Sequence, residues 1–451
     1  MNVLSIYNLL PVWIQNIAVS VMGYKIQKER YGKLFDEKYS LSINRDKYTE
    51  DKLKEYRDQK IREIVEYSYT HVLFYRKLFD ENKIDYKSIK GLSDLQKIPI
   101  IDKTIVQKYH DEFYSDEFRM KKNSIRHVHT SGTTGAGLNL NVTKEADAEN
   151  WAITWREHEK LGIKREMLCG YFAGRPIVPA KQKTPPFYRI NRPGKQLMFS
   201  SFHMSDDNLY SYVDTLNKYK PIWIHGYPSV ISLLADFINR TGYGLRYNVK
   251  VITLCSENVT EKHIQTIEKA FGIRPNQTYG QTEGVGCFRD YVPGKIKVIE
   301  DYSAVEFVKM EDGETHIVGT NFNNKAMPLI RYDTHDIAQC VDTPFERRVV
   351  NIDGRLEDYV KLIDGSRIGR LDHIFKDAEH VKEAQIVQKS LEYVIIRIVK
   401  LEGYTIDDEH RIRDLMDDRF GKRLKYDIEY VNCIPRTKNG KMRFVVSEVN
   451  E

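Results

Sequence analysis

The fold is decided by residues 222–278, which read IWIHGYPSVISLLADFINRTGYGLRYNVKVITLCSENVTEKHIQTIEKAFGIRPNQT. Short apolar runs alternate here with longer segments of helical periodicity. The pattern predicts strands over residues 222–225, 249–254 and 274–278, and helices over residues 229–240 and 260–271, with a glycine after each helix. Strands and helices that alternate in this way form a parallel sheet covered by helices, with ligand sites at the carboxyl ends of the strands.

A second informative stretch is the octet at residues 130–137, Thr-Ser-Gly-Thr-Thr-Gly-Ala-Gly, between strands predicted at residues 125–129 and 138–142. Glycines allow tight turns, and successive N–H groups and hydroxyls make a nest of donors for a phosphate. The octet continues into Leu138 and Asn139, so it lacks the Gly-Lys-Ser/Thr ending of a Walker loop. It therefore predicts a phosphate-binding loop of another kind, with a Gly/Thr-rich surface turn as the alternative.

Length and composition indicate a globular protein of two or three domains, since 451 residues exceed one ordinary core. Charged residues make up 30% of the chain and hydrophobic residues 41%, as in soluble proteins. The 70 basic and 64 acidic residues are mixed along the chain, whereas nucleic-acid binders show a basic stripe. The cysteines lie too far apart for a zinc site or a disulfide framework, which indicates a reducing cytoplasm: Cys169, Cys255, Cys287, Cys340 and Cys433.

Residues 1–24 carry no charged side chain, and they lack the basic start and cleavage site of a signal peptide. Polar residues recur near helical spacing and predict a helix. The helix has a broad apolar face, made of Leu9, Leu10, Trp13, Ile14, Ile17 and Val21. Pro11 and the polar residues argue against a membrane-spanning segment. We expect the helix to dock on the protein's own surface, with contact at a membrane interface as the alternative.

The rest of the chain divides by pattern. Helical periodicity predicts helices over residues 51–69 and 145–161, whereas residues 170–200 are rich in Gly, Pro and aromatics and predict loops over a pocket. Residues 296–350 contain short β-like runs and predict a second, antiparallel subdomain. Asp353-Gly354 is a turn signal, and a small α+β unit follows it.

Four separated motifs, in the order of the family, resemble those of the adenylate-forming superfamily. They are Thr130-Ser131-Gly132-Thr133-Thr134-Gly135, which resembles the phosphate loop; Tyr279-Gly280-Gln281-Thr282-Glu283, which looks like the aromatic-Gly-x-Thr-Glu motif; Arg331-Tyr332-Asp333-Thr334-His335-Asp336, which is similar to the Tyr-x-Thr-Gly-Asp motif; and Pro435-Arg436-Thr437-Lys438-Asn439-Gly440-Lys441-Met442-Arg443, which resembles the Pro-x-Thr-x-x-Gly-Lys motif. Residues 69–105 resemble the phenylacetate-CoA ligase branch. The opening helix and the length look most like its capsular-polysaccharide, CapK-like members.

The resemblance implies an α/β fold with a large N-terminal AMP-binding domain over residues 1–352, built from parallel sheets with helices plus a β subdomain. Within it, residues 1–50 form a peripheral helical region. A hinge over residues 353–358 contains Glu357, and residues 359–451 form a small, mobile α+β lid.

The resemblance also implies the chemistry. A carboxylate attacks the α-phosphate of ATP, and pyrophosphate leaves from the acyl-adenylate. Catalysis falls to Lys441, Thr282 and Glu283, of which Glu283 ligates Mg²⁺. ATP is bound by the phosphate loop and three further elements: Ser131, Gly132, Thr133, Thr134, Gly135, Tyr279, Gly280, Gln281, Asp336 and Arg355. For each carboxylate or lysine taken alone, an ordinary solvated side chain is the alternative.

Three departures from the family pattern affect the expectations. His335 stands where the family has Gly, Glu357 where it has the hinge Asp, and Gly365 comes one residue late in a loop that serves thioester formation. These departures therefore weaken the prediction of CoA as the acceptor more than the prediction of adenylation as the first step. The carboxylate pocket is predicted at strand ends and Gly/Pro loops, from Tyr171, Gly174, Arg175, His225 and Tyr227, with core packing as the alternative for the aromatics.

The expected function is ATP-dependent activation of a small-molecule carboxylate, followed by acyl transfer to an unidentified CoA, amine or sugar acceptor in surface-polysaccharide assembly. An aryl- or acyl-CoA ligase is the nearest alternative, and a nucleotide-binding pseudoenzyme or assembly factor is the alternative of another class. No nucleic-acid partner is expected. The expected location is the cytoplasm, with the inner face of the membrane as the peripheral alternative through residues 1–24.

Overall fold

The computed structural model describes residues 6–129, 138–175, 177–179, 181–292, 295–311, 313–343, 347–355, 360–363, 367–368, 371–375, 378, 380–420, 424–436 and 442–449. The predicted phosphate loop, Lys441 and Glu357 therefore lie outside the described residues.

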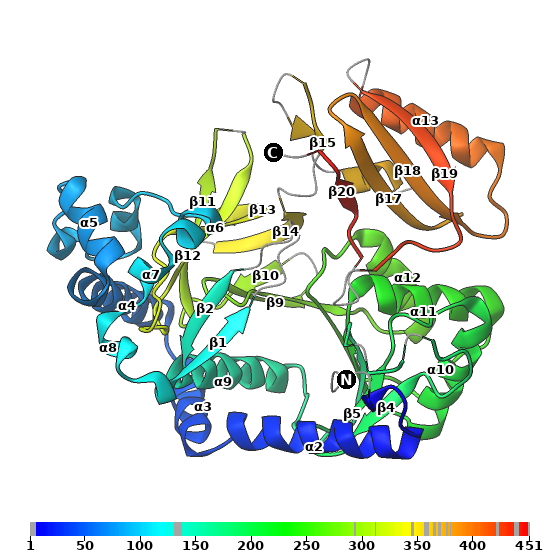
Figure 1. Cartoon of the computed structure of the whole chain (residues 1–451), viewed down its shortest axis with the longest axis horizontal. Coiled ribbons are helices and arrows are strands. Elements are labelled where there is room, and N and C mark those ends of the chain that lie inside the picture. The colour runs from blue at the N-terminus through cyan, green and yellow to red at the C-terminus, as the bar shows by residue number, and fades with distance from the viewer. Residues whose placement is uncertain are drawn as a thin grey trace.

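Helices cover the sheets and form much of the periphery (Figure 1). The α-helices are α2 (Val12–Arg30), α3 (Lys33–Arg45), α4 (Glu50–His71), α5 (Leu73–Glu81), α6 (Lys103–Lys108), α7 (His110–Phe113), α8 (Asp116–Arg119), α9 (Lys144–Lys160), α10 (Asp206–Tyr219), α11 (Pro228–Thr241), α12 (Glu261–Phe271) and α13 (Ile406–Phe420). Short 3-10 helices are η1 (Tyr86–Ser88), η2 (Leu92–Lys97), η3 (Lys122–Ser124) and η4 (Leu371–Phe375). The helices predicted over residues 51–69 and 145–161 are confirmed as α4 and α9.

The main sheet has twelve strands in the order β11-β12-β13-β14-β10-β9-β8-β7-β6-β3-β5-β4. Its strands are β3 (Cys169–Phe172), β4 (Tyr188–Asn191), β5 (Gln196–Phe199), β6 (Trp223–Gly226), β7 (Val251–Cys255), β8 (Asn276–Gly280), β9 (Cys287–Val292), β10 (Lys295–Val298), β11 (Ser303–Lys309), β12 (Thr315–Asn321), β13 (Tyr332–Asp342) and β14 (Arg347–Arg355). Separate antiparallel pairs are β1 (Ile125–His129) with β2 (Asn139–Thr143), and β15 (Val360–Lys361) with β16 (Arg367–Ile368).

The parallel part of the sheet confirms the prediction for residues 222–278. Strands β3, β6, β7 and β8 run parallel to one another, and α11 and α12 connect the last three. Both helices end at glycines in the left-handed region, Gly242 and Gly272, each with φ of +69°. Because this conformation is strained for other residues, the two glycines stop the helices where the sequence predicts.

The antiparallel part continues the same sheet. Strands β9 to β14 pair antiparallel with one another, as predicted, but β8 pairs with β9 through Thr278 and Arg289 and joins the two parts. The predicted antiparallel region is therefore present, and it continues the parallel sheet through β8 and β9. Local hydrophobic patterns reveal strand type but not which edge a strand extends.

Two segments that the sequence predicts as loops or turns contain strands in the structure. Residues 170–200 contain β3, β4 and β5, which have four residues each and show too few positions for a period to appear. Asp353 and Gly354 belong to β14 rather than to a turn. In β14 the pairing with β13 overrides the local turn preference.

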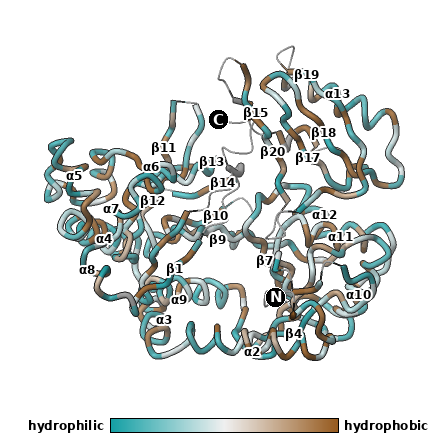
Figure 2. The backbone as a smooth tube through the Cα atoms, viewed as in Figure 1, coloured by the Kyte–Doolittle hydropathy of each residue, from teal (hydrophilic) through white to brown (hydrophobic). Residues whose placement is uncertain are grey.

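Helix α2 docks on the protein, as expected, but through its polar side. Gln15 is 2% exposed and accepts a 2.6 Å hydrogen bond from Nε of the buried Arg189. Asn16 accepts from the N–H of Ile190 at 2.8 Å, and Ser20 donates to its carbonyl at 3.0 Å. The broad apolar face is directed away from these contacts, and Figure 2 shows hydrophobic and hydrophilic residues interleaved along the helix.

A buried ion network ties α3 and α9 to the turn after β10. Asp301 receives two hydrogen bonds from Arg156, of 2.7 and 2.9 Å, and one from Nε of Arg45, of 2.8 Å. Arg45 also binds Glu149. All four side chains are at most 7% exposed. Burial would raise the pKa of Asp301, but its bonds to the two arginines outweigh burial and lower it.

The C-terminal part is an α+β unit. Strands β17 (Val381–Ser390), β18 (Tyr393–Lys400), β19 (Lys425–Tyr430) and β20 (Val445–Ser447) form a sheet in the order β19-β18-β17-β20. Helix α13 packs on it around Ile386, Ile396 and Met416. The unit meets the larger part through an ion pair between Lys382 and Asp206, with a distance of 2.5 Å.

Candidate active site

The carboxyl ends of the parallel strands bring several predicted pocket residues together. Tyr171 on β3, His225 on β6 and Thr253 on β7 are direct neighbours across the strands. The rings of Tyr171 and His225 lie 5.6 Å apart, and Nδ1 of His225 lies 2.7 Å from the Thr253 hydroxyl. On its other side, Nε2 of His225 lies 3.5 Å from Sγ of Cys255. The imidazole is thus held in one orientation by groups on both sides.

The other predicted pocket residues have unequal environments. Tyr227 is buried and its N–H donates to the carbonyl of Phe172 at 2.9 Å, and burial raises its pKa to about 12. Gly174 is buried, whereas Arg175 is exposed. Gly226 permits the close approach here, because a Cβ at that position would lie 2.1 Å from the Phe172 carbonyl. The wall of this region is therefore tightly packed, with Arg175 at its exposed rim.

Two residues predicted to bind the nucleoside are in direct contact. The hydroxyl of Tyr279, at the end of β8, donates a 2.6 Å hydrogen bond to Oδ2 of Asp336 on β13. The Tyr279 ring stacks on Phe288 with centroids 4.7 Å apart. Gln281 donates to the same hydroxyl at 3.1 Å. An aromatic ring, an amide and a carboxylate thus converge from segments far apart in the chain.

Asp336 is 7% exposed and pairs in register with Arg355 across β13 and β14. The two predicted ATP-binding residues therefore sit opposite each other on neighbouring strands. His335, between Thr334 and Asp336, has φ of +56°. This is the left-handed region that favours glycine, which explains why a glycine suits this position.

The imidazole of His335 contacts two carboxylates. Its Nε2 lies 3.7 Å from Oδ2 of Asp102, and its Nδ1 lies 3.4 Å from Oδ2 of Asp333. The contact with Asp102, together with the charge of Asp333, raises the pKa of His335 despite partial burial. Sequence patterns could not indicate Asp102 as the partner of His335, because the two residues are far apart in the chain.

His316, Asp333 and His335 form the one group among the described residues whose side chains could hold a metal ion, with ligand atoms within 4.8 Å of one another. The hydrogen bond from His316 to Asp333 is 2.9 Å long. This bond and the ion pairs of His335 account for the cluster without an ion.

The predicted magnesium ligand lies in the turn after β8. Thr282 is exposed and Glu283 is half-buried, and the Glu283 carbonyl accepts a 2.9 Å bond from Asn321. Gly284 has φ of +67°, and a Cβ there would lie 2.6 Å from Nδ2 of Asn321. The turn is therefore fixed against β12. Its hydroxyl and carboxylate oxygens are of the type that Mg²⁺ prefers, so these residues fit that ion.

Glu257 is a functional candidate that sequence reasoning missed. Its Oε1 accepts a 3.1 Å bond from the N–H of Met442, and its Oε2 accepts a 3.2 Å bond from the N–H of Ser229. Burial raises the pKa of this carboxyl, against the charge of Arg436. Met442 directly follows Lys441, so Glu257 holds the terminal motif beside the ends of β6 and β7. Its position directly after strand β7 was the available signal.

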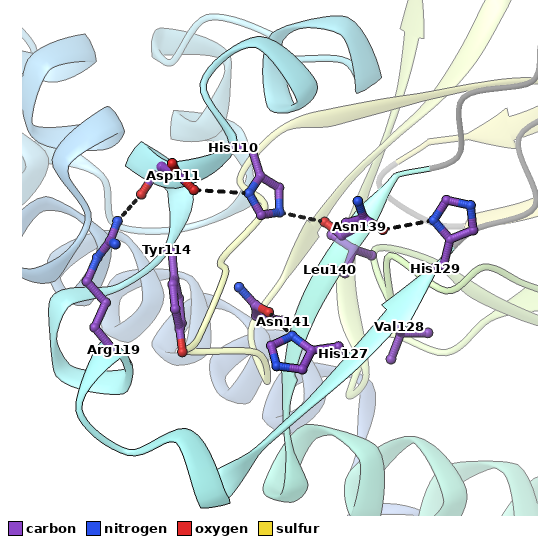
Figure 3. A pocket seen from close by; sticks show the side chains of 10 residues that line it. All are labelled: His110, Asp111, Tyr114, Arg119, His127, Val128, His129, Asn139, Leu140 and Asn141. Carbon is purple, nitrogen blue, oxygen red and sulfur yellow. Dashed lines mark hydrogen bonds and ion pairs between the residues drawn. The ribbon is translucent and has the colours of Figure 1, made fainter.

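A pocket of about 710 Å³ lies beside the β1–β2 hairpin (Figure 3). It is lined by His110, Asp111, Tyr114, Arg119, His127, Val128, His129, Asn139, Leu140 and Asn141. His129 and His127 are fixed by Asn139 and Asn141, at 2.9 and 2.7 Å. None of the predicted nucleoside or carboxylate residues lines it. The hairpin strands confirm the predictions over residues 125–129 and 138–142, and they flank the octet.

The chain is similar to several known proteins. Residues 362–448 match the family model of the CapK C-terminal domain. The chain is 27% identical over 456 residues to protein CapK of Staphylococcus aureus, covering 98% of this chain and 99% of that protein. It is 24% identical over 440 residues to a phenylacetate-coenzyme A ligase of Thermus thermophilus, covering 88% of this chain and 96% of that enzyme.

Among solved structures, 2-hydroxyisobutyryl-CoA ligase in the postadenylation state with 2-HIB-AMP superposes with a TM-score of 0.64, at 17% identity, covering 87% of this chain and 89% of that one. The same enzyme with 2-HIB-AMP and CoA in the thioesterification state gives a TM-score of 0.55. Among the described residues, no helix combines the length and apolar composition needed to cross a bilayer. By sequence the chain is similar to protein CapK and to phenylacetate-coenzyme A ligases, and its fold is similar to that of 2-hydroxyisobutyryl-CoA ligase.

Proposed function

We propose that this chain joins a small-molecule carboxylate to AMP, with release of pyrophosphate from ATP. The observation that carries the proposal is the hydrogen bond between Tyr279 and Asp336, with Arg355 opposite Asp336 on the next strand. A buried carboxylate is suited to accept hydrogen bonds from the two hydroxyls of a ribose, and an aromatic ring beside it is suited to stack on adenine. The relatives that are named as ligases support the same reaction.

In the proposed reaction, an oxygen of the substrate carboxylate attacks the α-phosphorus and the bond to the β-phosphate oxygen breaks. Ser131, Thr133 and Thr134 bind the departing phosphates, and Thr282 binds the α-phosphate. Glu283 would hold Mg²⁺, and the bound ion would neutralise charge on the phosphates. The ammonium of Lys441 bridges the carboxylate and the α-phosphate, where negative charge is concentrated.

The order of steps is supported by the contact between Glu257 and Met442. This contact joins Met442, in the terminal motif, to the part of the chain that we propose binds the nucleotide, as adenylation requires. We propose that residues 359–451 form a lid, that residues 353–358 form its hinge, and that the lid rotates after adenylation to admit an acceptor.

In the second step, a nucleophile attacks the acyl carbonyl, the bond to the phosphate oxygen breaks and AMP leaves. The acceptor is a thiol such as CoA, an amine or a sugar hydroxyl. We propose that the reaction serves surface-polysaccharide assembly, and the similarity to protein CapK supports this role. The second candidate, an aryl-CoA ligase, is favoured by the relationship to phenylacetate-coenzyme A ligases.

The test is carboxylate-dependent exchange of labelled pyrophosphate into ATP, with a panel of carboxylates and Mg²⁺. Lys441→Ala is expected to lower exchange at least about a hundredfold, because it removes charge stabilisation at the reacting atoms. Lys438→Ala, in the same motif, is the control and should retain exchange. Full exchange by Lys441→Ala, or none by the native chain with any acid, would leave a nucleotide-binding pseudoenzyme as the better description. Adding CoA and looking for a thioester separates the two acceptors.

A further inference from the structure

Helix α2 is attached to the protein through its polar side, and most of its apolar side chains are exposed. Strand β4 is an edge of the main sheet, because it pairs with β5 alone. Its outward N–H and carbonyl, at Ile190, bond to Asn16 and Ser20 of α2. Gly23 lets the helix approach closely, since a Cβ there would lie 1.9 Å from Oδ1 of Asn191. The polar residues of α2 thus cap an open sheet edge, which proteins commonly cover.

The consequence is a row of exposed apolar side chains, here called the α2 stripe: Leu9, Trp13, Ile17, Val21 and Tyr24, with exposed fractions of 78, 64, 53, 63 and 62%. Trp13, Ile17, Val21 and Tyr24 recur every three or four residues and so lie on one side of α2, and Leu9 precedes the helix. A contiguous apolar surface of this kind is rare on proteins that bind nothing there, and it usually marks an interaction site.

The surroundings of the α2 stripe are basic. No Asp or Glu occurs before Glu29, and α2 carries Lys25 and Lys28. The neighbouring segment, residues 167–205, also contains no acidic residue. It contacts α2 through β4, and Tyr7, which precedes α2, donates a 2.6 Å hydrogen bond to the Ile177 carbonyl. Its exposed cations are Arg175, Lys181, Lys183, Arg192 and Lys195.

We propose that the α2 stripe inserts into the interfacial region of an anionic phospholipid bilayer. An apolar row with Trp13 and Tyr24 among its members suits the boundary between headgroups and acyl chains. Each lysine or arginine near an anionic surface adds roughly 1 kcal/mol of attraction. A second copy of this chain fits the surface less well, because pairing two such faces would bring an excess of basic groups together, with Glu29 of α2 already paired to Lys25.

This attachment leaves the candidate active site accessible. In Figure 1, α2 runs along the lower edge of the molecule, and the C-terminal strands β17 to β19 lie on the upper side. Helix α2 and the C-terminal unit therefore lie on opposite sides of the molecule. The protein would act at a bilayer surface on a soluble or headgroup-linked acceptor, independently of which carboxylate it uses.

The test is flotation of the purified full chain with vesicles of phosphatidylcholine alone or mixed with phosphatidylglycerol. The chain should float with the anionic vesicles and be released by high salt. The variant Leu9→Ser/Trp13→Ser/Ile17→Ser/Val21→Ser should bind at least about tenfold more weakly, because it loses the inserted apolar groups. Lys181→Glu/Lys183→Glu should lower binding to anionic vesicles specifically. The control Met120→Ser/Ile406→Ser, at positions 90 and 61% exposed elsewhere, should bind like the native chain.

Equal binding by the four-residue stripe variant and the native chain would overturn the proposal, as would native protein that stays unbound. Sedimentation velocity tests the self-association alternative: a native dimer that the stripe variant converts to a monomer would replace the membrane with a second copy. Thermal unfolding of each variant verifies that it folds. None of these readouts depends on adenylation, so failure here is distinct from failure of the proposed function.

Discussion

The N–H of Met442 donates a 3.1 Å hydrogen bond to Oε1 of Glu257, across 185 positions of sequence. Glu257 belongs to the large part of the chain and Met442 to the terminal motif. The bond therefore sets the position of the segment that contains Lys441 relative to the strand ends. A lid that rotates during the reaction must break this bond, which makes Glu257 a candidate latch.

Glu257→Ala is expected to slow pyrophosphate exchange roughly tenfold to a hundredfold, because a hydrogen bond to a charged group contributes about 1.5–3 kcal/mol. Acyl transfer from preformed adenylate should change much less, since the bond would be broken at that stage. Glu261→Ala, an exposed carboxylate at the start of α12, is the control. Equal losses in both half-reactions would indicate a structural role instead.

Tyr279→Phe is expected to raise the KM for ATP about fivefold, because it removes the bond to Asp336 but keeps the ring stacked on Phe288. Asp336→Ala should weaken ATP binding tenfold or more, since it removes the proposed acceptor for the ribose hydroxyls. Initial rates of exchange against ATP concentration measure both effects. Unchanged KM values in both variants would place the nucleoside elsewhere.

His335 should make stability depend on pH. The pKa of His335 is raised in the folded protein by Asp102 and Asp333, so its stabilisation is fully present below about pH 6.5, the unfolded value. It is lost as pH rises through the higher folded pKa. His335→Asn, which tolerates the positive φ, should therefore flatten the fall in Tm between about pH 6 and pH 8. His410→Asn, exposed on α13, is the control; parallel Tm curves for native chain and His335→Asn would refute the assignment.

Asp301→Ala is expected to destabilise the fold by roughly 3–5 kcal/mol, because it leaves Arg45 and Arg156 buried without their shared carboxylate. Urea unfolding measures the loss, with exposed Asp36→Ala on α3 as the control. Since the pKa of Asp301 is lowered, its contribution is present above about pH 3.9 and is lost as pH falls through the folded value. A loss below about 1 kcal/mol would show that the arginines find other partners.

Part of the fold could be predicted because it depends on local rules. Alternating apolar runs and helical periods located β6, α11, β7, α12 and β8 to within two residues, and Gly242 and Gly272 fixed the helix ends. The short strands in residues 170–200 could not be predicted, because four residues are too few to show a hydrophobic period. The continuation of the sheet from β8 into β9 could not be predicted, because the sequence of a strand does not show which other strand it pairs with.

The sequence by itself determined the kinds of chemical group available: a Gly/Thr loop, a Tyr-Gly-x-Thr-Glu turn, an Asp after a Thr-His pair and a terminal lysine. Only the tertiary structure decided which groups meet, as with Tyr279 and Asp336, His335 and Asp102, or Met442 and Glu257. It also decided that α2 attaches through Gln15, Asn16 and Ser20, with its apolar side outward. The reason is that the backbone N–H and C=O groups at the open edge of β4 need hydrogen-bond partners once the sheet has formed. The periodicity of residues within α2 does not reveal this requirement.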